Sequence, residues 1–152
     1  GRIDNIIVQS GSTTPLSMTL QSIEYGDLRY PTVVPKSGDV SITCLLRMPF
    51  DILSQNVWTI DAFLVDNVDN PTIIHWLWKM CAPSFPANTW AEFLLDPSVE
   101  PAPDTAGVYY LYGIDVEYHQ PVTQEMYTLG CIFKPAPQIT VTDSGAISVE
   151  IN

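Results

Sequence analysis

The chain has few charged residues and very few basic ones. Only 15% of its 152 residues are Asp, Glu, Lys or Arg, and six Lys and Arg stand against 17 Asp and Glu, giving a formal net charge of −11. A surface with this balance repels phosphate, which argues against nucleic acid and anionic membrane surfaces as partners. No apolar run approaches the roughly 18 residues of a membrane span, so we expect no membrane insertion.

Cysteines are also scarce, and they are scattered. Cys44, Cys81 and Cys131 include no CxxC pair, and three thiols do not fit a disulfide scaffold. We therefore predict no metal and no cofactor. Cys44 and Cys131 both fall on rows expected to face inward, where they would pack as small hydrophobic groups or pair with each other. The compartment stays open, with an extracellular or surface location slightly favoured.

Apolar and aromatic residues are plentiful, at 46% and 11% of the chain. This content supports one sizeable core, so we predict a single domain over residues 1–152, with residues 1–14 as a candidate N-terminal arm. Period-two alternation dominates, and no segment has a helical stripe. We expect about nine strands, from segments at 16–21, 40–48, 57–65, 72–80, 89–95, 108–118, 127–133, 139–142 and 146–151, to which 3–9 would add an edge strand.

Strands with one apolar face need a second apolar layer, and no amphipathic helix is available to provide it. The predicted fold is therefore all-β, a two-sheet antiparallel β-sandwich of immunoglobulin-like or jelly-roll type. The stretch 104–110 resembles the strand-F corner of immunoglobulin-like domains over seven residues, although no Cys follows its tyrosine two positions later. The residues predicted for the core are Trp58, Trp76, Tyr110, Tyr112, Leu129 and Phe133.

No motif for catalysis is present, so we predict that the protein is not an enzyme and assign no catalytic, cofactor-binding or metal-binding residue. His75 and His119 are the two histidines, and neither belongs to a metal-ligand pattern. Asp115 and Glu117 share a strand face, where paired carboxylates either serve acid–base chemistry or, more often, keep the face soluble. The loop 66–71 is rich in oxygen ligands for calcium, but a hairpin turn uses the same residues.

Four tryptophans offer two alternatives. Trp58, Trp76 and Trp78 would form either an aromatic core, which the alternation favours, or an exposed platform for sugar rings. Trp90 lies in a proline-bounded segment and is the best single candidate for an interface anchor. Further apolar residues fall on second strand faces, where the domain itself or a neighbouring subunit must cover them: Leu45, Phe63, Ile73, Leu77, Tyr109 and Leu111.

These observations lead to a functional hypothesis. We expect a non-catalytic structural or interaction module that acts by protein–protein contact, as part of a surface appendage, an adhesin or a virion-like assembly. The partner would be another protein or a second copy of the chain. The alternative is a carbohydrate-binding β-sandwich module that uses exposed tryptophans.

Overall fold

The computed structural model describes residues 23–80, 84–95, 100–120, 122–143 and 148–151. These residues form nine strands and one turn of 3-10 helix at Ser54–Asn56, and they contain no α-helix, so none of them forms a helix able to cross a membrane. The strands are β1 (Glu24–Pro35), β2 (Ile42–Arg47), β3 (Val57–Val65), β4 (Ile74–Met80), β5 (Trp90–Leu95), β6 (Gly107–His119), β7 (Met126–Ile132), β8 (Gln138–Thr142) and β9 (Ser148–Ile151).

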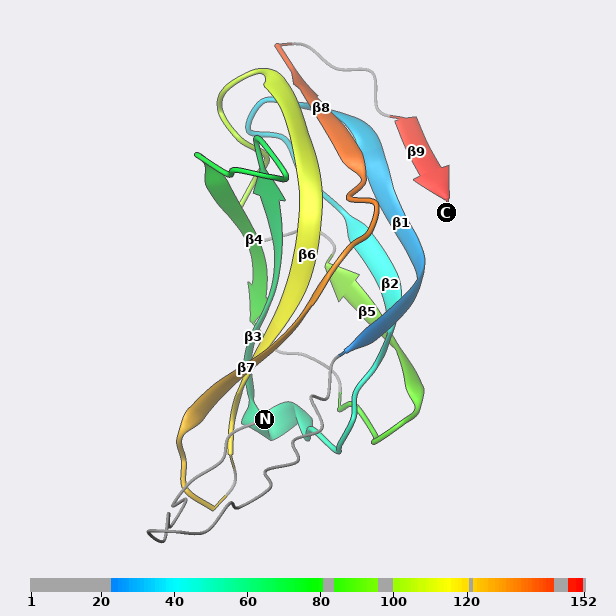
Figure 1. The fold of residues 1–152 in the computed structure, drawn as a ribbon, viewed down its shortest axis with the longest axis vertical. Coiled ribbons are helices and arrows are strands. Elements are labelled where there is room, and N and C mark those ends of the chain that lie inside the picture. Colours follow the sequence, from blue (N-terminus) through cyan, green and yellow to red (C-terminus); the bar gives the residue numbers. More distant parts are fainter. Residues whose placement is uncertain (1–22, 81–83, 96–99, 121, 144–147, 152) are drawn as a thin grey trace, which may run out of the picture.

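All nine strands belong to one curled sheet that forms a half-barrel (Figure 1). Its order is β4-β3-β6-β8-β1-β2-β5, while β7 pairs with the C-terminal half of β6 and β9 pairs with β1. Seven of the eight strand pairings are antiparallel, counting the β1–β9 and β6–β7 pairs, and β1–β8 is parallel. The all-β prediction is confirmed, but the purely antiparallel arrangement is wrong. Separation into two sheets is not confirmed, because β8 bonds to both β6 and β1.

Strand β1 was not predicted from the sequence, although it pairs with β2, β8 and β9. Its register shifts between Gly26 and Arg29 and again between Pro31 and Val33. Each shift adds a residue that breaks the period-two pattern, and proline removes a backbone donor from the ladder. The expected segments at 3–9 and 16–21, and the candidate arm at 1–14, lie outside the described residues.

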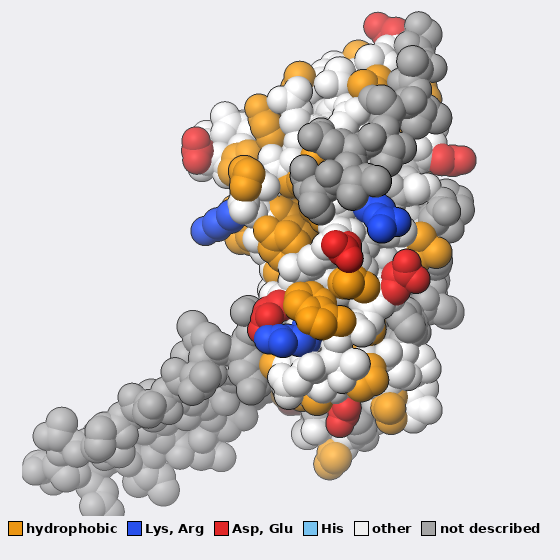
Figure 2. Space-filling model, turned by 90° about the vertical axis from the view of Figure 1, so that its right-hand side faces the viewer, with side chains coloured by type: hydrophobic (Ala, Val, Ile, Leu, Met, Phe, Trp, Pro, Cys, Tyr) orange, Lys and Arg blue, Asp and Glu red, His pale blue; other side chains and the backbone are white. Residues whose placement is uncertain are grey.

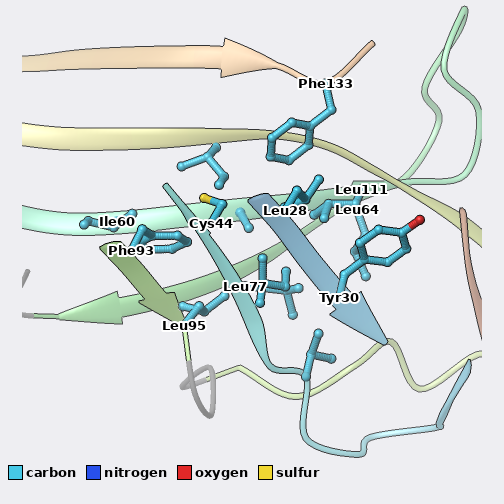
Figure 3. Packing of buried hydrophobic residues seen from close by; sticks show 14 of the residues in the cluster. Leu28, Tyr30, Cys44, Ile60, Leu64, Leu77, Phe93, Leu95, Leu111 and Phe133 are labelled. Carbon is cyan, nitrogen blue, oxygen red and sulfur yellow. The ribbon is translucent and has the colours of Figure 1, made fainter. Parts of the chain in front are cut away.

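The core fills the concave side of the half-barrel (Figure 3). Cys44 and Phe93 come from β2 and β5, and they face Ile60 and Leu64 of β3 across the interior. Phe133, which follows β7, closes one side and is 1% exposed. Burial of this apolar surface is the main stabilising contribution to the fold.

The predicted core residues of β6 point the wrong way because of a β-bulge. Phe63 pairs with Gly113 and the next residue, Leu64, pairs with Leu111, so Tyr112 is an extra residue in β6. The bulge reverses the alternation, since an added residue shifts every side chain before it to the opposite face. Tyr109 and Leu111 are consequently buried. The predicted core residues Tyr110 and Tyr112 lie on the side of the sheet that faces away from the core, and they are half-buried.

The tryptophan prediction is wrong for a different reason. On β4 the core side is occupied by Leu77, which is fully buried, and Trp76 lies on the opposite face with 47% of its surface exposed. Trp58 is an extra residue in β3, because Val57 pairs with Tyr118 and Thr59 with Glu117, and it is 50% exposed. Of the six predicted core residues, Phe133 is buried and Leu129 packs against the core at its edge.

Half of the apolar residues assigned to second faces are covered by the domain itself. Leu77, Tyr109 and Leu111 belong to the core. Leu45 and Phe63 are half-buried, and Ile73 is 47% exposed. The surplus apolar surface is therefore smaller than the sequence suggested, and Phe63 places part of it on the face that carries Trp76.

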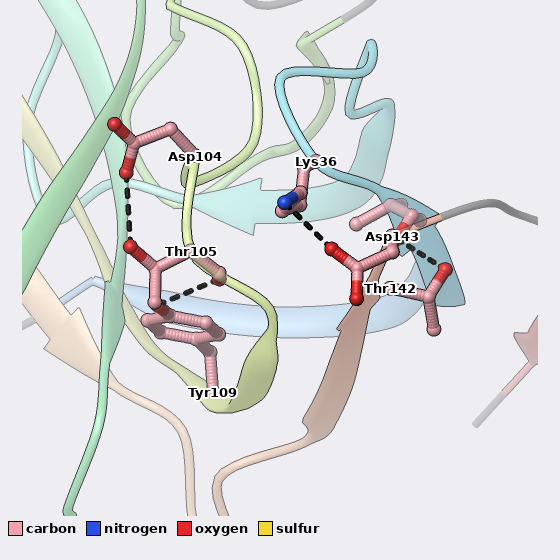
Figure 4. A network of polar contacts seen from close by, with 7 residues as sticks. Lys36, Asp104, Thr105, Tyr109, Thr142 and Asp143 are labelled. Carbon is pink, nitrogen blue, oxygen red and sulfur yellow. Dashed lines mark hydrogen bonds and ion pairs between the residues drawn. The ribbon is translucent and has the colours of Figure 1, made fainter.

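The beginning of β6 is fixed by a tyrosine corner (Figure 4). The Tyr109 hydroxyl donates a hydrogen bond to the backbone carbonyl of Thr105 at 3.1 Å, four residues upstream. Nearby, Lys36 and Asp143 form an ion pair at 2.6 Å between the end of β1 and the end of β8. The local arrangement matches the corner that the 104–110 stretch resembles in sequence.

Replacing Tyr109 with Phe removes this hydrogen bond while keeping the ring in place. We expect Tyr109→Phe to lower the free energy of unfolding by about 1–2 kcal/mol, measured by urea denaturation. Tyr110→Phe is the matched control, because Tyr110 lies on the opposite face of the same strand. Equal stability of the two variants would show that the corner contributes nothing.

Candidate functional site

The convex side of the sheet formed by β4, β3, β6 and β7 carries the most distinctive group of side chains. We call it the outer face. Residues directly opposite each other in an antiparallel pair share a face, so the strand register assigns its members. They include Ile74, Trp76 and Trp78 of β4, Thr59, Asp61, Phe63 and Val65 of β3, Tyr110, Gly113, Asp115 and Glu117 of β6, and Gly130 and Ile132 of β7. The extra residue Tyr112 is on the same face, because its ring contacts that of Phe63.

Aromatic rings form a continuous strip across three strands of the outer face. The ring centroids of Phe63 and Trp76 are 5.1 Å apart, and those of Phe63 and Tyr112 are 5.7 Å apart, both tilted by about 45–50°. Phe63 is paired with Gly113, and a Cβ at Gly113 would lie 3.0 Å from the Phe63 ring and overlap the Cys131 carbonyl oxygen. The ring thus fills the space above a glycine, which locks the strip onto the sheet.

A row of carboxylates lies beside the aromatic strip. Asp61 pairs with Asp115, and Glu117 follows on β6 opposite Thr59. The Thr59 hydroxyl lies 2.9 Å from Asp61 Oδ2 and 3.3 Å from Glu117 Oε2, and its single proton can be donated to one of them at a time. The Asp115 carboxylate lies over Gly130, where a Cβ would overlap it.

The electrostatics of this row are unfavourable to ionisation. Burial, together with the negative charges of Asp61 and Glu117, raises the pKa of Asp115 to about 6. Burial also raises the pKa of Asp61, which is 9% exposed, against the opposing hydrogen bond from Thr59. Desolvation and like charges both disfavour a charged carboxylate.

The strands that carry this row, and β7 beside them, contribute no basic residue of their own. Strands β3, β6 and β7 contain no Lys or Arg in their sequence. Arg47 pairs with Glu24, and Lys36 pairs with Asp143. The outer face therefore combines exposed aromatic rings with uncompensated negative charge.

The sequence predicted part of this arrangement. Asp115 and Glu117 share a face as expected, and His119 accompanies them, but the bulge moves Tyr109 and Leu111 to the core side. Asp61 and Thr59 were missed as their partners. The available signal was the presence of Asp61 in the middle of an otherwise apolar central strand.

The histidines and thiols do not converge on one site among the described residues. The carbonyl oxygen of Pro101 accepts a hydrogen bond from His75 Nε2 at 2.7 Å, and that of Gln124 from His119 Nδ1 at 3.3 Å. Cys44 and Cys131 are both free thiols. Burial raises the pKa of both, that of Cys131 to about 11, which makes them poor nucleophiles at neutral pH. Cys81 lies outside the described residues.

The acidic loop after β3 uses its oxygens internally. Asp66 accepts hydrogen bonds from the hydroxyl and the backbone N–H of Thr72 and from the backbone N–H of Ile73, which hold its pKa at about 2. Asn67 Oδ1 accepts from the backbone N–H groups of Asp69 and Asn70. The predicted β3–β4 hairpin is thus confirmed. Across the described ranges, no three His, Cys, Asp or Glu side chains are placed to hold a metal ion.

Figure 2 shows a side of the molecule on which hydrophobic side chains lie between acidic and basic ones. Trp90 belongs to β5, where it pairs with Arg47 of β2 and its ring lies close to Gly26 of β1. It is 44% exposed, as expected for a candidate interface anchor. The Arg47 guanidinium lies 5.4 Å from the centroid of its ring, and Arg47 also bonds to Glu24 at 2.6 Å. One side of the indole is consequently already occupied by a cation.

A groove separates β1 from the segment that follows β7. Two adjoining hollows of about 630 and 350 Å³ share Tyr25 and Lys134 as lining residues. The Lys134 backbone N–H donates to the Tyr25 hydroxyl at 3.2 Å, and the Tyr25 and Phe133 rings meet edge to face at 4.6 Å. These contacts bridge the two sides of the half-barrel where the described strands do not pair.

No protein-family model matches the chain, and no curated protein sequence matches it.

The raised pKa of Asp115 has a measurable consequence for stability. A carboxyl with an ordinary value of 3.8 when unfolded and about 6 when folded favours the folded state below about pH 4, and this contribution is lost as the pH rises through 6. We expect Asp115→Asn to raise the free energy of unfolding at about pH 7.5 by ~1 kcal/mol, a value reduced for partial solvent exposure, and to change it little at about pH 4.

Urea denaturation at the two pH values measures this effect. Glu92→Gln is the matched control, because Glu92 is exposed on β5, away from the outer face. Destabilisation by Asp115→Asn at neutral pH would contradict the interpretation that the carboxylate row strains the fold.

The glycines beneath the outer face should differ in their tolerance of a methyl group. At Gly113 an added Cβ meets the Cys131 backbone and the Phe63 ring, so we expect Gly113→Ala to lower the free energy of unfolding by about 2 kcal/mol. At Gly130 it meets mainly the end of the Asp115 side chain, which can rotate away. In thermal denaturation, Gly113→Ala should have a lower melting temperature than Gly130→Ala. The reverse order would contradict the proposed packing.

Proposed function

We propose that the chain is a non-catalytic interaction module that binds a protein partner through its outer face. The observation that carries this proposal is the strip formed by Trp76, Phe63 and Tyr112 beside the Asp61–Asp115 pair. Trp and Tyr bury large areas with little loss of side-chain freedom, and they are enriched at the centres of protein interfaces.

The aromatic strip is held rigidly by the sheet, which favours binding. Trp76 and Phe63 stand on paired strands, and Tyr112 is fixed by the bulge in β6. A surface held by a sheet loses less conformational entropy on binding than one carried by loops. A sandwich of immunoglobulin-like type is the finer description of the fold that we propose, supported by the core between the two sides of the curl and by the Tyr109 corner.

The absence of enzymatic activity is likewise proposed, and it is supported by the positions of the reactive groups. His75 and His119 bond to backbone carbonyls, and the thiols have raised pKa values. Acyl-transfer chemistry would require a nucleophile beside a general base. Membership in a surface appendage, an adhesin or a virion-like assembly, and self-association, stay predictions.

Selection of peptides tests the proposed binding face. A random peptide library displayed on phage is selected against the immobilised protein, and the enriched peptides are titrated against variants. We expect Trp76→Ala combined with Tyr112→Ala to weaken binding by about tenfold or more, as for central interface anchors. Trp90→Ala, on β5, should leave binding unchanged. Enriched peptides that lose binding only with Trp90→Ala would place the site over β5 and refute the proposal.

A carbohydrate ligand is the second candidate, favoured by the exposure of Trp58 and Trp76. Exposed rings can stack on the apolar faces of sugars, and carboxylates can accept hydrogen bonds from hydroxyl groups. Binding on a glycan array that is lost in Trp76→Ala, with no peptide enriched in the selection, would support this candidate over a protein partner.

A further inference from the structure

We propose that the partner presents an arginine-bearing segment to the outer face, with the guanidinium group held between the half-buried carboxylates of Asp115 and Glu117 and the aromatic rings beside them, while the buried Asp61 adds negative charge next to Asp115. This inference depends on the proposed function and adds the chemistry of the partner. It commits the outer face to a basic protein segment rather than to a neutral sugar.

Charge complementarity is the first argument. Asp61 and Asp115 are directly paired, and Glu117 shares the Thr59 hydroxyl with Asp61. The strands that carry them contribute no Lys or Arg, and the whole chain has a net charge of −11. A cation docked on this row would relieve repulsion that the folded chain leaves in place, whereas a neutral ligand would bury the charges without relieving it.

The aromatic neighbours specify the kind of cation. Trp78 pairs with Asp61 in register, and the strip of Trp76, Phe63 and Tyr112 lies one register row away. A planar guanidinium stacks on aromatic rings and donates paired hydrogen bonds to carboxylates at the same time. An ammonium is a compact, strongly hydrated charge that fits this combination less well.

A bare metal ion does not meet the same requirements. Within the part of the chain that the structure describes, no three acidic, His or Cys side chains are placed to coordinate one ion. The carboxylates are spread along two strands, with Asp61 on β3 and both others on β6. An extended basic segment can follow such a row, with its backbone crossing the rigid strands.

The energetics of the row agree with a binding role. Asp115 and Asp61 both have raised pKa values in the isolated chain, with Asp115 at about 6. A guanidinium placed beside Asp115 would lower both values, so binding should release protons near pH 6. The other groups facing Asp115 are Glu117 of the same strand, Thr59 of β3, and Gly130 and the Cys131 thiol of β7.

Three synthetic peptides test the inference by isothermal titration calorimetry at low salt. They share an alternating threonine backbone and carry arginine, lysine or citrulline, the neutral counterpart of arginine, at the remaining positions. We expect the arginine peptide to bind at least tenfold more tightly than the citrulline peptide and severalfold more tightly than the lysine peptide. Binding of the arginine peptide should weaken as the pH falls from about 7.5 to 5, because Asp115 takes up a proton.

Variants separate the carboxylate row from general attraction to an acidic protein. Asp115→Asn and Asp61→Asn should each weaken the arginine peptide by about threefold to tenfold, and Glu92→Gln on β5 should not. Because removal of Asp115 is expected to stabilise the fold, loss of binding cannot be attributed to unfolding. Circular dichroism confirms the fold of each variant.

The outcomes distinguish this inference from the proposed function. If the selected peptides bind in a manner that needs Trp76 but is indifferent to arginine and to Asp115→Asn, the outer face binds proteins and the inference is wrong. If the arginine peptide is equally sensitive to Glu92→Gln and to Asp115→Asn, attraction is nonspecific and the inference is also wrong. If neither Trp76 nor Asp115 affects any peptide, both proposals fail.

Discussion

The pairing of β3 with β6 determines which side chains the molecule hides and which it displays. Phe63 pairs with Gly113 and Leu64 with Leu111, which leaves Tyr112 without a partner in the ladder. Because of this one added residue, Leu111 and Ile114 both reach the core, and Tyr112 reaches the outer face. A regular ladder would place Leu111 outside or Ile114 outside, since a shift of one residue exchanges the faces of a strand. The core, the aromatic strip and the carboxylate row all depend on this bulge at Tyr112.

Alternation in the sequence located most strands and the inner face of β2, but it assigned β4 and the first half of β6 to the wrong face. The strands at β3, β4, β6 and β7 and the β3–β4 hairpin were predicted, because their apolar and polar residues alternate over many positions. On β4, the row with Trp76 is more apolar than the row with His75 and Leu77, yet the second row faces the core. Hydrophobicity alone assigns such a strand to the wrong side when its exposed face serves a purpose other than solubility. The strand β1 was missed because its two irregularities and its prolines erase the pattern.

Only part of the candidate site could be predicted from the sequence, because local spacing places residues within one strand but not between strands. Asp115 and Glu117 follow each other at an interval of two on one strand, and local spacing places them on one face. Their association with Asp61 and Thr59 depends on the register between strands separated by more than 40 residues, which no local pattern encodes. Natural sequences depart from the rules of stable folding mainly where function requires it. A row of like charges on β3 and β6, strands without Lys or Arg, is a departure of this kind if the proposed binding role is correct.

The position of β1 beside β8 also affects how the protein is made. Val33 pairs with Thr140, and the Thr142 hydroxyl donates to the Val34 carbonyl across 108 residues of sequence. A chain emerging from the ribosome therefore carries β1 with only β2 to pair with, long before β8 and β9 exist. Long-range pairing of this kind slows folding. Until β8 is made, the second edge of β1 has no strand to pair with, and a chain truncated before residue 138 would leave that edge open to other chains.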